Sequence, residues 1–185
     1  SYAGQIPLIL KINSSNSLSR NSDAPTQAIT GSISEAIRLG CSAIGFTIYP
    51  GSDDSLNMIS EIQELAAEAK SHGLAVVVWS YPRGGNISKE GETAVDIVSY
   101  AAHMAALIGA HIIKVKPPTE FLEDSNAKKV YIDNNVPIST LRDRIQNVVE
   151  SCFQGKRIVI FSGGSAKNTE GLLNEIREIN LGGGF

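Results

Sequence analysis

The segment His-Ile-Ile-Lys-Val-Lys at residues 111–116 decides how the rest of the sequence is interpreted. It follows Gly109, which can end a preceding helix, and its Val and Ile content is typical of a β-strand. Side chains alternate along a strand, so Lys114 and Lys116 share one face while Ile113 and Val115 take the other. Four further apolar runs occur along the chain, at Ile6–Ile12, Ser42–Ile48, Leu74–Trp79 and Arg157–Phe161.

Helical patterns separate these runs. In one of them, Thr93 and Asp96 are spaced to form a capping box at the helix start. The polar stretch Pro117–Pro137 is expected to be a long loop with a short helix around Glu120–Ala127. The longer helices are expected over Ser32–Leu39, Asp54–Ser71, Ala94–Ile108, Thr140–Phe153 and Asn168–Ile179.

The strands begin about 30 to 45 residues apart, which is the spacing of βα units in a parallel sheet. An open doubly wound sheet and a (β/α)8 TIM barrel share this α/β pattern. A complete barrel has about 250 residues, whereas this chain has 185, opens on a strand and stops at Gly182–Phe185, where another strand is expected. We therefore interpret residues 1–185 as a single barrel domain, an incomplete fragment of about five βα units lacking the N-terminal strands and the last strand.

The composition argues against several classes of function. A net charge of −3 without long runs of one sign disfavours nucleic-acid and membrane-surface partners, and no apolar run is long enough to span a bilayer. Cys41 and Cys152 lie in apolar neighbourhoods and are interpreted as reduced core residues of a cytoplasmic protein. The three histidines show no ligand spacing, so no metal or other cofactor is expected.

The two lysines of residues 111–116 stand out because functional residues of α/β folds lie at the carboxyl ends of strands. Both would point into a barrel interior, where an unpaired charge is costly. Burial and a second positive charge favour the neutral amine, which can attack a ketone and form an imine. Lys114 is therefore a candidate Schiff-base lysine. Alternatively, Lys114 and Lys116 pair with carboxylates at the barrel mouth.

Other strand ends carry side chains suited to a phosphorylated ligand. Tyr81 could move a proton near an imine and Arg83 could clamp a phosphate, although rim packing and simple solvation are alternatives. Lys11 could face the interior as an electrostatic partner or form a salt bridge at the rim. The turn Ser162-Gly163-Gly164 leads into a helix, where backbone N–H groups can bind phosphate, or it is plain turn chemistry.

Five ordered motifs resemble one family over essentially the whole chain. They are Ile6–Asn13, Gly45–Ser52, Val78–Gly84, Gly109–Lys116 and Phe161–Gly164. They are similar to the archaeal-type (DhnA-like) class I fructose-bisphosphate aldolases, with the bacterial branch nearest. Because that family is a TIM barrel, the resemblance favours the barrel over the doubly wound sheet.

The resemblance implies a metal-independent lyase of glycolysis and gluconeogenesis, which reversibly cleaves fructose 1,6-bisphosphate to dihydroxyacetone phosphate and glyceraldehyde 3-phosphate. It also implies a homo-oligomer. The resemblance implies imine formation by Lys114 and proton transfer by Tyr81. It implies that Ser162, Gly163 and Gly164 form part of the cradle for the phosphate on the ketone half of the substrate, and that Arg83 lies near the other phosphate. Lys116 and Lys11 would give electrostatic support.

Two features of the family do not occur in this sequence. They are an acidic residue in an Asp-Gln/His-Gly type motif on the first strand and a Gly-Arg on the last, expected upstream of Ser1 and downstream of Phe185. An isolated polypeptide of this extent is therefore expected to be inactive. Two alternatives stay open: a relative acting as an aldolase or thiolase on another phosphorylated ketose or dicarbonyl, and a non-catalytic phosphate-binding barrel with Lys114 solvated or ion-paired.

Overall fold

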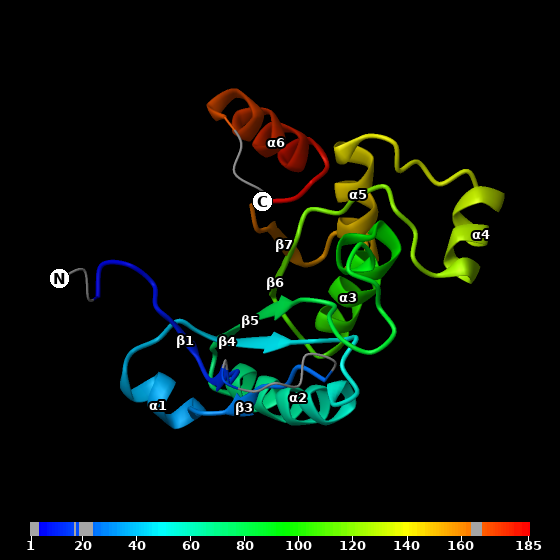
Figure 1. Ribbon diagram of the computed structural model, residues 1–185. Coiled ribbons are helices and arrows are strands. Elements are labelled where there is room, and N and C mark those ends of the chain that lie inside the picture. Colours follow the sequence, from blue (N-terminus) through cyan, green and yellow to red (C-terminus); the bar gives the residue numbers. More distant parts are fainter. Residues whose placement is uncertain (1–3, 17, 19–23, 164–167) are drawn as a thin grey trace.

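The computed structural model describes residues 4–16, 18, 24–163 and 168–185 of the chain. Its main sheet is parallel with the order β1-β4-β5-β6-β7, so each strand is hydrogen-bonded to the next main-sheet strand along the chain (Figure 1). This sequential order is that of a barrel, because a doubly wound sheet reverses its order at a switch point. The strands are β1 (Ile9–Lys11), β4 (Ala43–Ile48), β5 (Ala75–Ser80), β6 (Ile112–Val115) and β7 (Ile158–Phe161), which confirms the five predicted strands.

Two further features lie at the two ends of this sheet. A separate antiparallel pair, β2 (Asn13–Ser14) and β3 (Ala28–Ile29), was not predicted and follows directly on β1. At the other end, Phe185 lies beside β7: its N–H donates to the carbonyl of Val159 at 2.9 Å, and its carbonyl accepts from the N–H of Phe161 at 2.8 Å. This is the hydrogen-bond pattern of a parallel pair.

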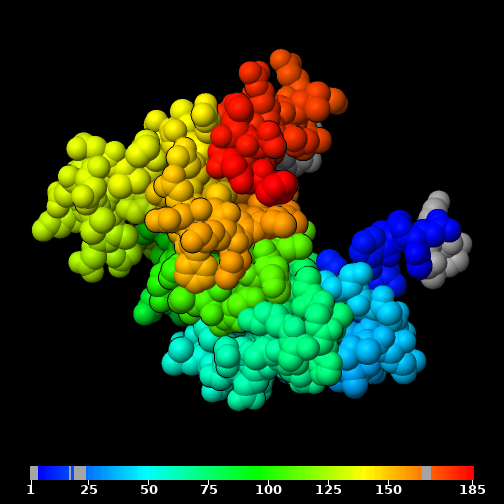
Figure 2. Space-filling model, turned by 180° about the vertical axis from the view of Figure 1, so that it is seen from behind, coloured from blue at the N-terminus to red at the C-terminus, as the bar shows by residue number. Residues whose placement is uncertain are grey.

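Apart from α4, the helices agree with the predicted patterns to within a few residues. Ser32 and Thr140 begin their helices with capping boxes, in which each side chain accepts a backbone N–H and the third helical residue bonds back. Figure 2 shows α4, which has no buried residue, projecting from the body of the molecule. The helices are α1 (Ile33–Arg38), α2 (Ser55–Ser71), α3 (Val95–Leu107), α4 (Ser125–Asp133), α5 (Leu141–Ser151) and α6 (Thr169–Leu181).

Two local predictions were wrong. Thr93 does not cap α3: it ends a short 3-10 helix, η1 (Gly91–Thr93), and the extended Ala94 precedes α3 without a side-chain cap. Asp96 instead accepts two backbone N–H groups of the β6–α4 loop, from Glu123 at 3.2 Å and Asp124 at 2.9 Å. The short loop helix begins five residues later than expected because Asp124 is its N-cap and accepts the N–H of Ala127.

The sheet has one helix-covered face and one inner face. Ile44, Phe46, Val78 and Ile113 are fully buried on the covered face, where α2 packs on β4 and β5, and α3 packs on β5 and β6. The alternate residues of the same strands point to the inner face. That face corresponds to the barrel interior, and it carries the candidate lysine.

Candidate active site

Lys114 lies on the inner face of β6, in a row that crosses four strands. The parallel register aligns Thr47 with Trp79, Trp79 with Lys114, and Lys114 with Ile160. The indole of Trp79 crosses towards β4, since a Cβ built on Gly45 would lie 2.5 Å from its Cζ3 atom. Only glycine at position 45 leaves room for the Trp79 ring. The register thus places Lys114 between Trp79 and Ile160 on the two neighbouring strands.

The structure distinguishes Lys114 from Lys116. Lys114 is half-buried, and within the described part of the chain its ammonium group makes no hydrogen bond or ion pair. Lys116 pairs with Glu92, with 3.7 Å between Nζ and Oε2. Lys116 therefore fits the alternative in which the lysines pair with carboxylates, whereas Lys114 has no carboxylate partner among the described residues.

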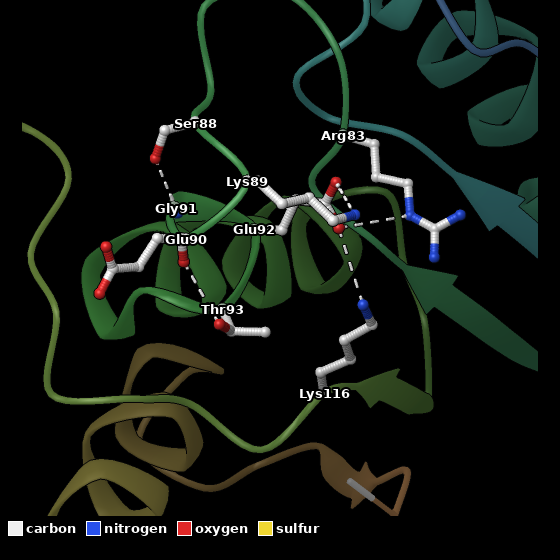
Figure 3. Close-up of polar contacts among 8 residues, drawn as sticks. All are labelled: Arg83, Ser88, Lys89, Glu90, Gly91, Glu92, Thr93 and Lys116. Atoms are coloured by element: carbon white, nitrogen blue, oxygen red, sulfur yellow. Dashed lines mark hydrogen bonds and ion pairs between the residues drawn. The ribbon is translucent and has the colours of Figure 1, made fainter. Parts of the chain in front are cut away.

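Glu92 is a functional candidate that the sequence reasoning missed. Its Oε2 atom also lies 3.8 Å from Nε of Arg83, and its Oε1 atom accepts a hydrogen bond from Nζ of Lys89 at 2.9 Å. Figure 3 shows Arg83 and Lys116 approaching this carboxylate from two different segments. We call Arg83, Lys89, Glu92 and Lys116 the Glu92 cluster. Three positive charges and one negative charge leave it with a net charge of +2.

Two loops fix the turn that carries Glu92. The carboxylate of Glu123 accepts the N–H of Ser88 at 2.7 Å and its hydroxyl at 2.8 Å. Gly91 packs against this carboxylate so closely that a Cβ would lie 2.6 Å from its carbon. The N–H of Thr119 donates to the carbonyl of Thr93 at 2.7 Å. The β5–α3 loop and the β6–α4 loop are therefore tied together on both sides of Glu92.

Tyr81 and Arg83 follow β5 and lie near each other. The N–H of Tyr81 donates to the carbonyl of Ile48 at 3.1 Å, which continues the β4–β5 ladder beyond the last strand residue. The Arg83 guanidinium carbon lies 5.8 Å from the centroid of the Tyr81 ring, within the range of a cation–π contact. Arg83 Nε is buried and has no hydrogen-bond partner among the described residues.

The turn after β7 lies beside a cavity of about 750 Å³. The N–H and hydroxyl of Ser162 both donate to the carbonyl of Val115, at 2.8 and 3.1 Å, so these two donors are engaged. Gly163 lines the cavity together with Lys116, and a Cβ on it would meet open space. The predicted cradle residue Gly164 lies outside the described residues. The cavity therefore connects the end of β7 with the Glu92 cluster through Lys116.

Lys11 lies apart from this cavity and belongs to a polar network at the end of β1. Its Nζ donates to the carbonyl oxygen and to Oδ1 of Asn13, and to Oε1 of Gln27 at 3.3 Å. Burial lowers the pKa of the Lys11 amine. Asn13 in turn bonds the backbone of Thr47 in both directions at 2.8 Å. Lys11 is thus held by neutral oxygen atoms, without a rim salt bridge among the described residues.

Sequence reasoning also missed Asn13 and Gln27, whose side chains accept hydrogen bonds from Lys11. Asn13 could have been found from the sequence because it is the last residue of the motif Ile6–Asn13, whereas Gln27 lies in none of the five motifs. Among the residues that the structure describes, no group of three or more His, Cys, Asp or Glu side chains could hold a metal ion. In the same residues, no helix is long and apolar enough to cross a bilayer.

The sequential parallel sheet and the half-buried lysine on its inner face are the features of a (β/α)8-barrel protein with a functional site at its strand ends. Comparison with known families identifies it further. A family model described as DeoC/LacD family aldolase matches residues 1–179, and the chain belongs to that family.

Individual relatives agree with this assignment. The class 1 fructose-bisphosphate aldolase of Thermoproteus tenax is 44% identical over 115 residues, which cover 62% of this chain and 42% of that protein. A probable class 1 fructose-bisphosphate aldolase of Chlamydia muridarum is 34% identical over 177 residues, covering 88% of this chain and 48% of that protein. A solved Schiff-base-forming fructose-1,6-bisphosphate aldolase matches with a TM-score of 0.78 at 32% identity, over 100% of this chain and 63% of that one. The chain spans about half the length of the curated relatives it matches.

Proposed function

We propose that this chain contains the Schiff-base lysine and part of the substrate site of a class I fructose-bisphosphate aldolase, a lyase. The observation that carries the proposal is the Lys114 amine, half-buried on the inner face and without an ion-pair partner in the described part of the chain. The aldolases to which the chain is similar give independent support, since one of them is a Schiff-base enzyme.

In the proposed reaction, the neutral Lys114 amine attacks the ketone carbon of fructose 1,6-bisphosphate, and loss of water gives an imine. The protonated imine nitrogen withdraws electrons when a base removes the proton of the C4 hydroxyl. The C3–C4 bond then breaks, glyceraldehyde 3-phosphate leaves, and the bonding pair remains as an enamine. Protonation of the enamine carbon, with Tyr81 as the acid, and addition of water release dihydroxyacetone phosphate and restore the amine.

The remaining predicted residues take binding roles in this proposal. Arg83 and Lys116 attract one phosphate through the net positive charge of the Glu92 cluster. Gly163 offers backbone to the other phosphate at the end of β7, with Ser162 shaping the turn. Lys11 supplies positive charge from β1. As part of the same proposal, the enzyme is a cytoplasmic homo-oligomer of sugar-phosphate metabolism.

Reduction of the full-length protein with borohydride in the presence of dihydroxyacetone phosphate, followed by peptide mass mapping, tests the mechanism. We expect a stable adduct on Lys114 that disappears in Lys114→Met and persists in Lys128→Met, which removes an exposed lysine of α4. An adduct on Lys116 would move the role to that residue, and no adduct on any lysine would refute the imine mechanism. Cleavage activity is expected to survive EDTA.

A further inference from the structure

Glu92 contacts Arg83 and Lys116, the two cations that the proposed function assigns to a phosphate, and is less exposed than either. Arg83 follows β5 and Lys116 follows β6, so no local sequence relationship brings them together. They meet at one oxygen atom of Glu92, at 3.8 and 3.7 Å. The Glu92 side chain is 14% exposed, against 43% for Arg83 and 36% for Lys116. The carboxylate is therefore the inner member of the group, and the two cations are the outer members that an arriving ligand meets.

The position of Glu92 is set by contacts other than those with its cations. The 3-10 helix that carries it is held by Ser88, whose hydroxyl accepts the N–H of Gly91 at 2.9 Å, and by the carboxylate of Glu123. Thr93 is joined to Thr119 on the far side of Glu92. The backbone at Glu92 is thus fixed before any substrate binds, as an orienting group requires.

Like charges need a counter-ion to lie together. Without Glu92, an arginine and a lysine at neighbouring strand ends would repel each other and turn towards solvent. The distances of 3.7 and 3.8 Å exceed the usual N–H···O hydrogen-bond length of about 2.9 Å. Glu92 therefore orients the two side chains through charge while leaving the cluster with a net charge of +2 for an anion.

We propose that Glu92 is a positioning residue that holds Arg83 and Lys116 side by side for a phosphate group of the substrate and does not itself contact the substrate. This inference rests on the proposed function and adds a residue to the same site. A positioning role and a purely electrostatic role predict opposite changes in anion binding when the Glu92 charge is removed. Neutralising Glu92 would raise the cluster charge to +3 and strengthen anion binding if charge alone mattered, whereas a positioning role predicts weaker binding.

The test is a comparison of Glu92→Gln with Glu90→Gln in the full-length protein. Glu90 lies on the same turn, is exposed and points away from the cluster in Figure 3, so it matches the charge change without the contacts. For Glu92→Gln we expect KM for fructose 1,6-bisphosphate to rise about five- to tenfold while kcat changes by less than about twofold. Glu90→Gln should keep both constants. An unchanged or lower KM in Glu92→Gln would overturn the inference.

A double-mutant cycle with Arg83→Ala separates positioning from general damage to the fold. If Glu92 acts through Arg83, adding Glu92→Gln to Arg83→Ala should raise KM by less than about twofold. Fully multiplicative effects would contradict the inference. Thermal stabilisation by inorganic phosphate provides a readout that needs no catalysis: the half-saturating phosphate concentration should rise in Glu92→Gln and not in Glu90→Gln. An active wild type with no Glu92 effect defeats only the inference, whereas an inactive wild type whose phosphate binding depends on Glu92 defeats only the aldolase assignment.

Discussion

Replacing Gly45 by alanine tests the packing beside the candidate lysine. The new Cβ would lie 2.5 Å from Cζ3 and 3.1 Å from Cη2 of the Trp79 ring, and 3.3 Å from Cγ2 of Ile9. Carbon atoms in contact normally lie about 3.5–4.0 Å apart, so the indole has to move by about 1 Å or more. Inserting a methyl group into a tight site of this kind costs about 1–3 kcal/mol. We expect the free energy of unfolding of Gly45→Ala to fall by that amount.

Urea unfolding followed by circular dichroism measures the loss, and tryptophan emission reports the ring itself, because Trp79 is the only tryptophan among the 185 residues. Lys114 is the register neighbour of Trp79, so borohydride trapping at Lys114 should also become slower. Gly163→Ala is the matched stability control, since its Cβ meets open space. A Gly45→Ala protein with wild-type stability and unchanged emission would refute the described position of the indole.

Three further predictions concern burial and charge. Asp96→Ala should lower the free energy of unfolding by about 2–4 kcal/mol in urea titrations, because two backbone N–H groups lose a charged acceptor; a loss below about 0.5 kcal/mol would contradict this. Burial, with nearby positive charges, lowers the pKa of His111 in the folded protein. The contribution of His111 to the free energy of unfolding is therefore complete above its unfolded-state pKa of about 6.5. It is lost as the pH falls through the lower pKa of the folded state. In urea titrations at several pH values, the free energy of unfolding should fall less towards acid pH in His111→Gln than in His72→Gln. An equal fall in both variants would argue against this role of His111. Burial raises the pKa of Cys152 to about 11, so a thiol reagent at pH 8 should label Cys41 and leave Cys152 unmodified until the protein unfolds; native labelling of Cys152 would disprove its burial.

The order and type of the main elements could be predicted because each reflects a local pattern. Apolar runs rich in Val and Ile gave β4 to β7, and apolar residues at helical spacing gave the helices between them. The start of α3 was misassigned because Thr93 is drawn into a 3-10 turn and its N–H bonds to Glu90. The loop helix α4 was placed too early because its cap, Asp124, looked like any other polar loop residue. These errors arise where a tertiary contact or a single cap outweighs the local pattern.

The residues of the candidate site likewise differ in whether a local pattern or a tertiary contact reveals them. Lys114 could be found because alternation along a strand fixes its face, and the register then places it beside Trp79. Glu92 could not be found, because its approach to Arg83 and Lys116 depends on how two loops are tied together. A carboxylate three residues before the start of a helix is ordinary in a sequence. It becomes notable only when the fold brings two cations to it.

Lys116 now has a more central place than the sequence suggested. It contacts Glu92 at the end of β6 and also lines the cavity that reaches Gly163 at the end of β7. These are the two regions assigned to the two phosphates of the substrate, so Lys116 lies between them. The chain as a whole carries a net charge of −3, and a doubly phosphorylated ligand would therefore be attracted by this local positive charge and not by the molecule in general. Within the proposed site, Lys114, which has no ion-pair partner among the described residues, suits covalent chemistry, whereas Lys116, which is paired with Glu92, suits binding of the anion.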